Sequence, residues 1–201
     1  MGIFTEIRNE HLIRELQREL NTDILLFGFD GATYFGNLQK TEDCRVAYLT
    51  PAVEGGSNVE IQSPSGEDVD VKFAHVDLWM VVAKATGVKS DPFSSDGGSS
   101  SPGGGGPTGG GPGPRTEASE RQESRDLICL LRRMIGDEVV ITTLGGFLFR
   151  GTLGEVDDEL AFLSVDDIFL PGTSSEISSD EVSTVVINLE AVTSVSLSAE
   201  S

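Results

Sequence analysis

The chain has 201 residues, which allows one large domain or two small ones. Its formal net charge of −19, from 33 acidic against 14 basic residues, repels free nucleic acid unless a local basic surface exists. Its two cysteines and two histidines make neither a disulfide framework nor a zinc pattern, and it has no signal-like segment or bilayer-length apolar run. We therefore expect a soluble cytoplasmic protein with no cofactor, no metal and no membrane partner.

The first predicted element is a helix. Its apolar residues recur at helical spacing and are Leu12, Ile13, Leu16 and Leu20. Strands are then predicted at residues 23–29, 33–40, 45–50, 69–74 and 77–83, with a variable loop at 51–68. The last strand contains Trp79 in an apolar run without alternation, so we expect that run to be covered on both faces.

Residues 90–116 are rich in glycine, serine and proline and cannot bury enough apolar surface to fold. This composition predicts a disordered linker between two domains. The predicted boundaries are 5–87 for the first domain, 88–118 for the linker and 119–198 for the second domain.

The part after the linker repeats the part before it. Shifting the first half by 115 residues places its helix, first strands and glycines on those of the second half without a gap. With a shift of 116, residues 71–76 lie over 187–192. A second helix is predicted to end at Gly136, as the first ends at Asn21. The second set of strands is predicted at 138–144, 147–156, 160–165, 184–189 and 192–197, with a variable loop at 171–183.

Four glycines indicate how the strands turn. Gly31 and Gly146 stand in hairpin turns that need a positive φ, whereas Gly36 and Gly151 stand inside strands. An interior glycine suggests a sharp bend that lets a short sheet curl. The predicted fold is therefore mainly β, with one N-terminal helix per domain and two five-stranded, bent antiparallel barrels.

This layout resembles the Sm-like (LSm/Hfq-like) family. GGFLFRGTLGEVDDELAFL, residues 145–163, is similar to the first Sm motif, and INLEAVTSV, 187–195, stands where the short second motif would lie. The resemblance implies two tandem Sm-like barrels. It also implies that the barrels associate by pairing the fourth strand of one with the fifth strand of the next.

The same resemblance identifies the positions where a nucleotide would bind. These ligand-loop positions and their neighbours are Glu42, Lys72, Asp157, Asp158, Glu159 and Asn188. Stacking a base needs an aromatic ring or a guanidinium plane, and reading its edge needs an amide. Neither half has this combination at these positions, so the usual uridine pocket is not expected.

Two groups of residues allow more than one interpretation. The acid run from Asp157 to Glu159 is typical of a solvated turn, although such oxygen ligands also suit a hard cation. Trp79 fills the core or contributes to a contact between barrels. The chain has no nucleophile elbow, phosphate loop or metal-binding histidine pair.

We therefore expect a non-enzymatic structural or interaction protein that associates with itself through barrel edge strands, as a ring or pseudo-ring. Another protein is a possible partner. The alternative is an Hfq-like RNA-binding protein that uses non-standard contacts. Its candidates are the arginines of the second helix, Arg121, Arg125, Arg132 and Arg133.

Overall fold

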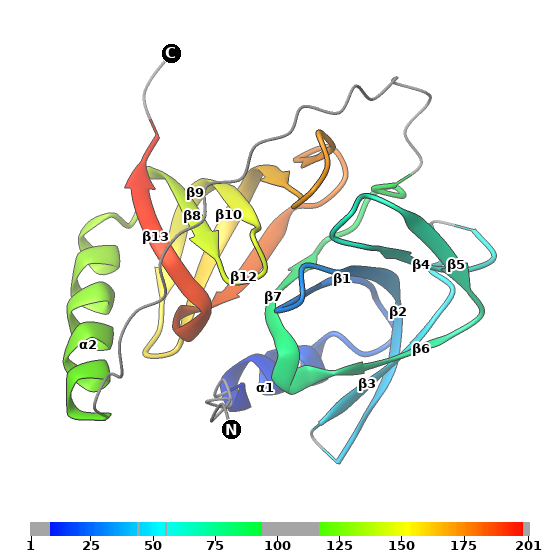
Figure 1. Ribbon diagram of the computed structural model, residues 1–201, viewed down its shortest axis with the longest axis horizontal. Coiled ribbons are helices and arrows are strands. Elements are labelled where there is room, and N and C mark those ends of the chain that lie inside the picture. Colours follow the sequence, from blue (N-terminus) through cyan, green and yellow to red (C-terminus); the bar gives the residue numbers. More distant parts are fainter. Residues whose placement is uncertain (1–8, 44, 55, 94–116, 199–201) are drawn as a thin grey trace.

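The computed structural model describes residues 9–43, 45–54, 56–93 and 117–198. Over these residues the chain is mainly β, with one helix at the start of each half and a sheet of 13 strands (Figure 1). Within this described part, neither helix is long and apolar enough to cross a bilayer. Most of the predicted linker, residues 94–116, lies outside the described residues.

The two halves repeat one order of elements, with two inserted strands in the first half and one in the second. The first half consists of α1 (Glu10–Arg18), β1 (Asp23–Gly28), β2 (Thr33–Glu42), β3 (Val46–Thr50), β4 (Val59–Gln62), β5 (Asp68–Val71), β6 (Ala74–Asp77), the 3-10 turn η1 (Leu78–Met80) and β7 (Val81–Thr86). The second half consists of α2 (Glu117–Arg133), β8 (Glu138–Thr143), β9 (Leu148–Val156), β10 (Leu160–Phe169), β11 (Glu176–Ser178), β12 (Thr184–Asn188), the 3-10 turn η2 (Leu189–Ala191) and β13 (Val192–Leu197).

Both helices are followed by a residue in the left-handed backbone conformation, as the sequence predicts. φ is 65° at Asn21 and 92° at Gly136, a region that glycine and asparagine adopt most easily. Each residue then donates a 2.7 Å backbone hydrogen bond to the second strand of its half, Asn21 to Leu38 and Gly136 to Leu153. The predicted correspondence between the halves is confirmed over these elements.

The halves share one continuous sheet, in place of the two five-stranded barrels that the sequence predicts. The main path of the sheet runs β13-β8-β9-β10-β12-β7-β1-β2-β3-β6. β12 of the second half pairs antiparallel with β7 of the first, with Val185 opposite Ala85 and Val186 opposite Lys84. Every residue of β7 except the last is buried, but Met80, in the same apolar run before β7, is 42% exposed. The expectation that the run around Trp79 is covered on both faces is therefore correct only for the part of the run inside β7.

Several predicted boundaries are wrong because the insertions form strands of their own. The predicted loop 51–68 contains β4, which pairs with β2 and β5. β10 extends to Phe169, past its predicted end, and pairs there with β11. The predicted strand 77–83 is interrupted by η1, so Trp79 lies half-buried in a 3-10 turn.

An aromatic cluster packs the two halves against each other. The ring centroid of Phe27 on β1 lies 5.1 Å from that of Phe147 and 5.2 Å from that of Phe149, both in edge-on geometry. All three side chains are fully buried in an apolar cluster that spans both halves. Such aromatic pairs add to the stabilisation that burial alone provides. The two halves therefore share a core.

The equivalent surface of the second half, beside β13, is polar. At the positions that correspond to Phe27 and Phe35, it carries Thr142 and Arg150. The Arg150 Nε donates a 2.8 Å hydrogen bond to the Glu138 carboxylate. Hydroxyl groups and an ion pair thus stand beside β13 where phenyl rings stand beside β7.

Gly36 and Gly151 lie inside the second strands, where a side chain does not fit. A Cβ on Gly151 would lie 1.9 Å from a carbonyl oxygen of β10, and a Cβ on Gly36 would lie 2.8 Å from a carbonyl oxygen of β3. The third strand therefore approaches the second strand very closely at this glycine in both halves. Gly31 and Gly146 stand in the hairpin turns with φ of 85° and 86°.

Candidate functional site

The candidate site is the place where α1, η1 and η2 meet at the junction between the halves. Asn188 is fully buried before η2, and its Oδ1 accepts a 2.9 Å hydrogen bond from the Glu190 backbone. Its side-chain amide donates to Oδ1 of Asn9, which is also fully buried. The Asn9 amide donates in turn to the Leu78 and Val81 carbonyl oxygens, the latter at 3.0 Å. Two amides thus connect the start of α1 to both halves.

Asn9 is the residue of this site that sequence analysis missed. An asparagine directly before a helix is a recognisable N-cap signal, yet the Asn9 side chain makes no capping bond to α1. Its partners are separated from it by 69, 72 and 179 residues in the sequence. Local pattern therefore gives the position of Asn9 and says nothing about its contacts.

Replacing Asn9 by alanine should lower the free energy of unfolding by about 2 to 4 kcal/mol, because it leaves two carbonyl groups and the Asn188 amide buried without this partner. Urea unfolding measures the change. Glu10→Ala, at the exposed neighbouring position, is the matched control and should cost less than about 0.5 kcal/mol. Equal losses for the two variants would contradict the role assigned to Asn9.

The first-half counterpart of Asn188 is Asp77, not Lys72. Both Asn188 and Asp77 stand directly before a 3-10 turn and accept a hydrogen bond from the backbone N–H two residues on, at 3.1 Å for Asp77. The predicted correspondence of 71–76 with 187–192 is therefore wrong. Lys72 lies exposed in the turn between β5 and β6.

The three acids of the turn between β9 and β10 have separate partners. Asp157 accepts a 2.8 Å hydrogen bond from the Asp158 backbone, and Asp158 accepts a 3.1 Å hydrogen bond from Arg132. Glu159 Oε2 lies 3.8 Å from His11 Nε2 on α1. The carboxylates thus engage different groups. Among the residues with described positions, no group of three or more His, Cys, Asp or Glu side chains could hold a metal ion.

The loop contacts of the two halves match each other. The first residue of η2 donates a 2.9 Å backbone bond to Glu159, and the first residue of η1 donates a 2.7 Å backbone bond to Arg45, so Arg45 is the counterpart of Glu159. Glu42 forms an ion pair with Lys40. The hydrogen bond between these two side chains lowers the pKa of the Glu42 carboxyl. Among the predicted ligand-loop positions, Glu159 and Asn188 meet at the junction, while Glu42 and Lys72 do not.

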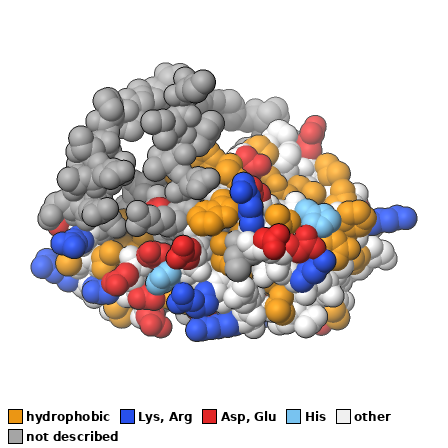
Figure 2. Space-filling view, turned by 90° about the horizontal axis from the view of Figure 1, so that it is seen from below, with side chains coloured by type: hydrophobic (Ala, Val, Ile, Leu, Met, Phe, Trp, Pro, Cys, Tyr) orange, Lys and Arg blue, Asp and Glu red, His pale blue; other side chains and the backbone are white. Residues whose placement is uncertain are grey.

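A groove of about 290 Å³ lies between α1 and the hairpin of β9 and β10. Basic side chains of the helix and acidic side chains of the hairpin both line it, together with the apolar Leu160 and Phe162. The charged residues are His11, Arg14, Glu15, Arg18, Glu155 and Asp157. Seen from the side of α1, basic and acidic side chains are intermixed on the surface (Figure 2).

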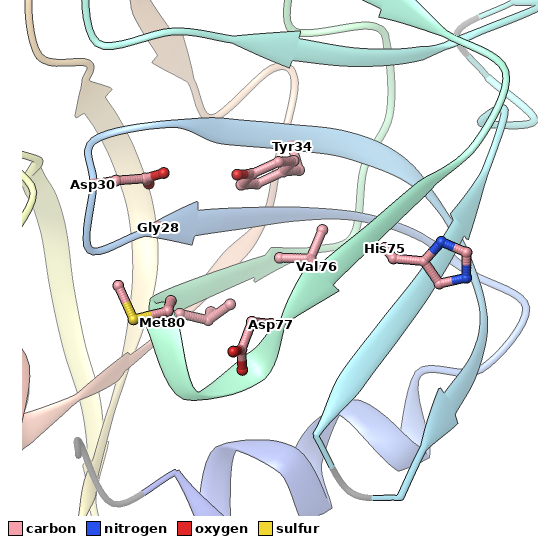
Figure 3. Close-up of a pocket in the computed structure, with 8 residues that line it drawn as sticks. Gly28, Asp30, Tyr34, His75, Val76, Asp77 and Met80 are labelled. Atoms are coloured by element: carbon pink, nitrogen blue, oxygen red, sulfur yellow. The ribbon is translucent and has the colours of Figure 1, made fainter.

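A second depression of about 190 Å³ lies between the turn after β1 and the segment from β6 to η1 (Figure 3). Asp30 and Tyr34 stand on one side of it and Asp77 on the other, while the His75 ring points away from them. Burial, helped by the Asp30 carboxylate, raises the pKa of the Tyr34 hydroxyl. Tyr34 and His75, which could act as acid and base, therefore do not face each other.

Carboxylates also gather on the hairpin of β4 and β5. Burial, together with the charges of Asp91, Asp70 and Asp68 and a hydrogen bond to Asp91, raises the pKa of Glu60 to about 7. Burial and the same neighbours raise the pKa of Asp68. Asp91 belongs to residues 88–93, which the sequence assigns to the linker. The hydrogen bond from Glu60 thus connects that segment to the hairpin.

Replacing Glu60 by glutamine should raise the stability at pH 8 by about 1 kcal/mol and change it little at pH 4. The pKa of Glu60 in the folded chain lies above its ordinary value of 4.5, so folding favours the protonated carboxyl. Its contribution to stability is complete below about pH 4.5 and is lost as the pH rises through about 7; partial exposure reduces the effect. Urea midpoints at both pH values test this, with Glu67→Gln as the exposed control on the same hairpin.

No protein-family model and no curated protein matches this chain.

Proposed function

We propose that this chain is a non-enzymatic Sm-like protein, built from two tandem copies of one small barrel, that assembles with further copies of itself through edge strands. The similarity of residues 145–163 and 187–195 to the two Sm motifs supports this proposal. The repeated order of strands in the two halves supports it further. In the Sm-like family, the fourth strand of one barrel pairs with the fifth strand of the next.

The pairing of β12 with β7 is the observation that carries the proposal. Leaving out the inserted strands, β12 is the fourth strand of the second half and β7 is the fifth strand of the first. In the described part of the chain, β6 pairs only with β3, and β13 pairs only with β8. One fourth strand and one fifth strand are therefore left at the two ends of the sheet, and such edges invite pairing with another chain.

β13 of one chain fits β6 of another in the register of the internal junction. β6 is the counterpart of β12, and β13 is the counterpart of β7. The register between β12 and β7 therefore places Ser196 opposite Ala74 and Leu197 opposite Phe73 when β13 pairs with β6. Leu197 and Phe73 are 59% and 54% exposed in the single chain, so their pairing would remove two large apolar side chains from water. If six barrels close a ring, three chains are needed.

Light scattering tests the assembly directly. The expected mass is three times the 21.4 kDa of the chain, and it should fall on dilution as the ring dissociates. A strictly monomeric mass at high protein concentration would rule the proposal out.

Disulfide cross-linking tests the register. With the native Cys44 and Cys129 replaced by serine, Ala74→Cys combined with Ser196→Cys should give cross-linked dimers and trimers under mild oxidation. Ala74→Cys combined with Thr193→Cys is out of register and serves as the control. Equal cross-linking of the two pairs would contradict the register derived from the internal junction.

The groove beside α1 favours a second candidate function, which is Hfq-like RNA binding through non-standard contacts. His11, Arg14 and Arg18 could contact phosphates there, and Phe162 offers a ring for base stacking. This function predicts salt-dependent affinity for short U-rich or A-rich RNA that Arg14→Glu weakens. Undetectable binding at low salt would eliminate it.

A further inference from the structure

The helices α1 and α2 share a sequence pattern but differ in their surroundings. Leu12 and Ile13 of α1 are 1% and 4% exposed, whereas their counterparts Leu127 and Ile128 on α2 are only half-buried. Leu130 on α2 is 47% exposed. α2 thus presents an apolar surface to solvent that α1 does not.

α1 is more deeply buried because the second half covers it. Leu160 and Val186 belong to the same apolar cluster as the buried leucines of α1. Beside them, His11 of α1 approaches Glu159. Figure 1 shows α1 below the junction of β7 and β12, whereas α2 lies at the far end of the sheet, beside β13. α1 belongs to the first half and therefore also packs across the junction on the second half.

The counterpart of this covering surface lies on the free edge of the first half. On β3 and β6 lie the first-half counterparts of the residues that α1 covers. Together with the adjoining Phe73, they form a surface that we call the edge patch: Val46, Tyr48, Phe73 and His75. The Tyr48 ring centroid lies 4.9 Å from that of His75 and 6.0 Å from that of Phe73. Hydrophobic side chains are gathered on the surface at the end of the molecule that holds β3 and β6 (Figure 2).

We propose that α2 of one chain docks on the edge patch of the next chain, in the way that α1 docks on the second half of its own chain. The occupant of the edge patch is therefore a second copy of this chain. The proposal rests on the edge-strand assembly proposed above, because pairing β13 with β6 brings α2 over the edge patch. Docking buries Leu127, Ile128 and Leu130 against Tyr48 and His75.

The polar groups at the two junctions support this arrangement, because the acidic residue lies on the strand edge at one junction and on the helix at the other. Within the chain, His11 of α1 approaches Glu159. The counterparts of these residues are Asp126 on α2 and Arg45 on the edge of the first half, and both are exposed. Asp126 of one chain therefore meets Arg45 of the next.

Reversal of these two charges tests the docking. Asp126→Arg and Arg45→Asp should each weaken chain association about tenfold, since an attraction between partly exposed charges is replaced by a repulsion. The double variant should regain most of the affinity. Asp180→Arg, an exposed reversal on the turn after β11, is the control and should leave association unchanged. Sedimentation velocity over a dilution series measures each affinity.

A variant of the apolar contact provides an independent test. Leu130→Glu changes an exposed residue, so the single chain should fold normally, and association should weaken at least tenfold. The two proposals can fail separately. Suppose that the in-register cysteine pair forms cross-links, but that Leu130→Glu and both charge reversals associate like the unchanged chain. Edge-strand assembly is then correct and helix docking is wrong. If the unchanged chain is monomeric and cross-links do not form, the assembly itself is wrong. Failure of the double reversal to restore affinity would overturn the pairing of Asp126 with Arg45.

Discussion

Replacing Gly151 by alanine should lower the free energy of unfolding by about 3 kcal/mol or more. The added Cβ would lie 1.9 Å from the Ser164 carbonyl oxygen, far inside van der Waals contact. Because that neighbour is backbone in the middle of a paired strand, it cannot move aside without breaking the ladder between β9 and β10. Thermal or urea unfolding measures the loss.

Gly154, on the same strand, is the matched control. A Cβ at Gly154 has its nearest neighbour at 3.6 Å, an ordinary contact, and alanine there should change the stability by less than about 1 kcal/mol. Gly36→Ala should fall between these two variants, because its contact of 2.8 Å is less severe. If Gly151→Ala and Gly154→Ala have equal effects, the close approach of β10 to β9 at Gly151 is not a constraint on the fold.

Replacing Phe27 by alanine should cost about 3 to 5 kcal/mol and uncouple the halves. The substitution leaves a cavity in a fully buried site and removes both edge-on contacts, with Phe147 and Phe149. Since this ring packs the two halves together, we expect the single unfolding transition to separate into two. Calorimetry detects such a separation.

Phe29→Ala is the control for the aromatic cluster. Phe29 lies just beyond the end of β1 and is 36% exposed, so its loss should cost about 1 kcal/mol and leave one transition. A Phe27→Ala variant that still unfolds in one transition would show that the pairing of β12 with β7 couples the halves without the aromatic cluster.

The local sequence pattern was sufficient to predict the repeat, the ends of the helices and the roles of the glycines. Asn21 and Gly136 were recognisable because a helix stop depends on the conformation of one residue. Gly36 and Gly151 were recognisable because glycine inside a strand otherwise weakens the strand. The correspondence of the halves held through the second strand, where neither half has an insertion.

The junction was not predictable in the same way. The pairing of Ala85 with Val185 joins strands separated by the linker, and neither strand carries a local sign of its partner. The error at Lys72 arose because 71–76 and 187–192 have similar residue types, while the insertion in the first half ends at a different point. The cap before each 3-10 turn, at Asp77 and Asn188, shows the true correspondence only once the turns are seen.

The unequal surfaces beside β7 and β13 have a consequence for how a ring of these chains would come apart. The junction within the chain is lined by Phe27 and Phe35, whereas the proposed junction between chains would be lined by Thr142 and the ion pair of Arg150 with Glu138. Water and salt weaken the second kind of junction far more readily than the first. Such a ring would open only between chains, and its subunits would exchange two halves at a time.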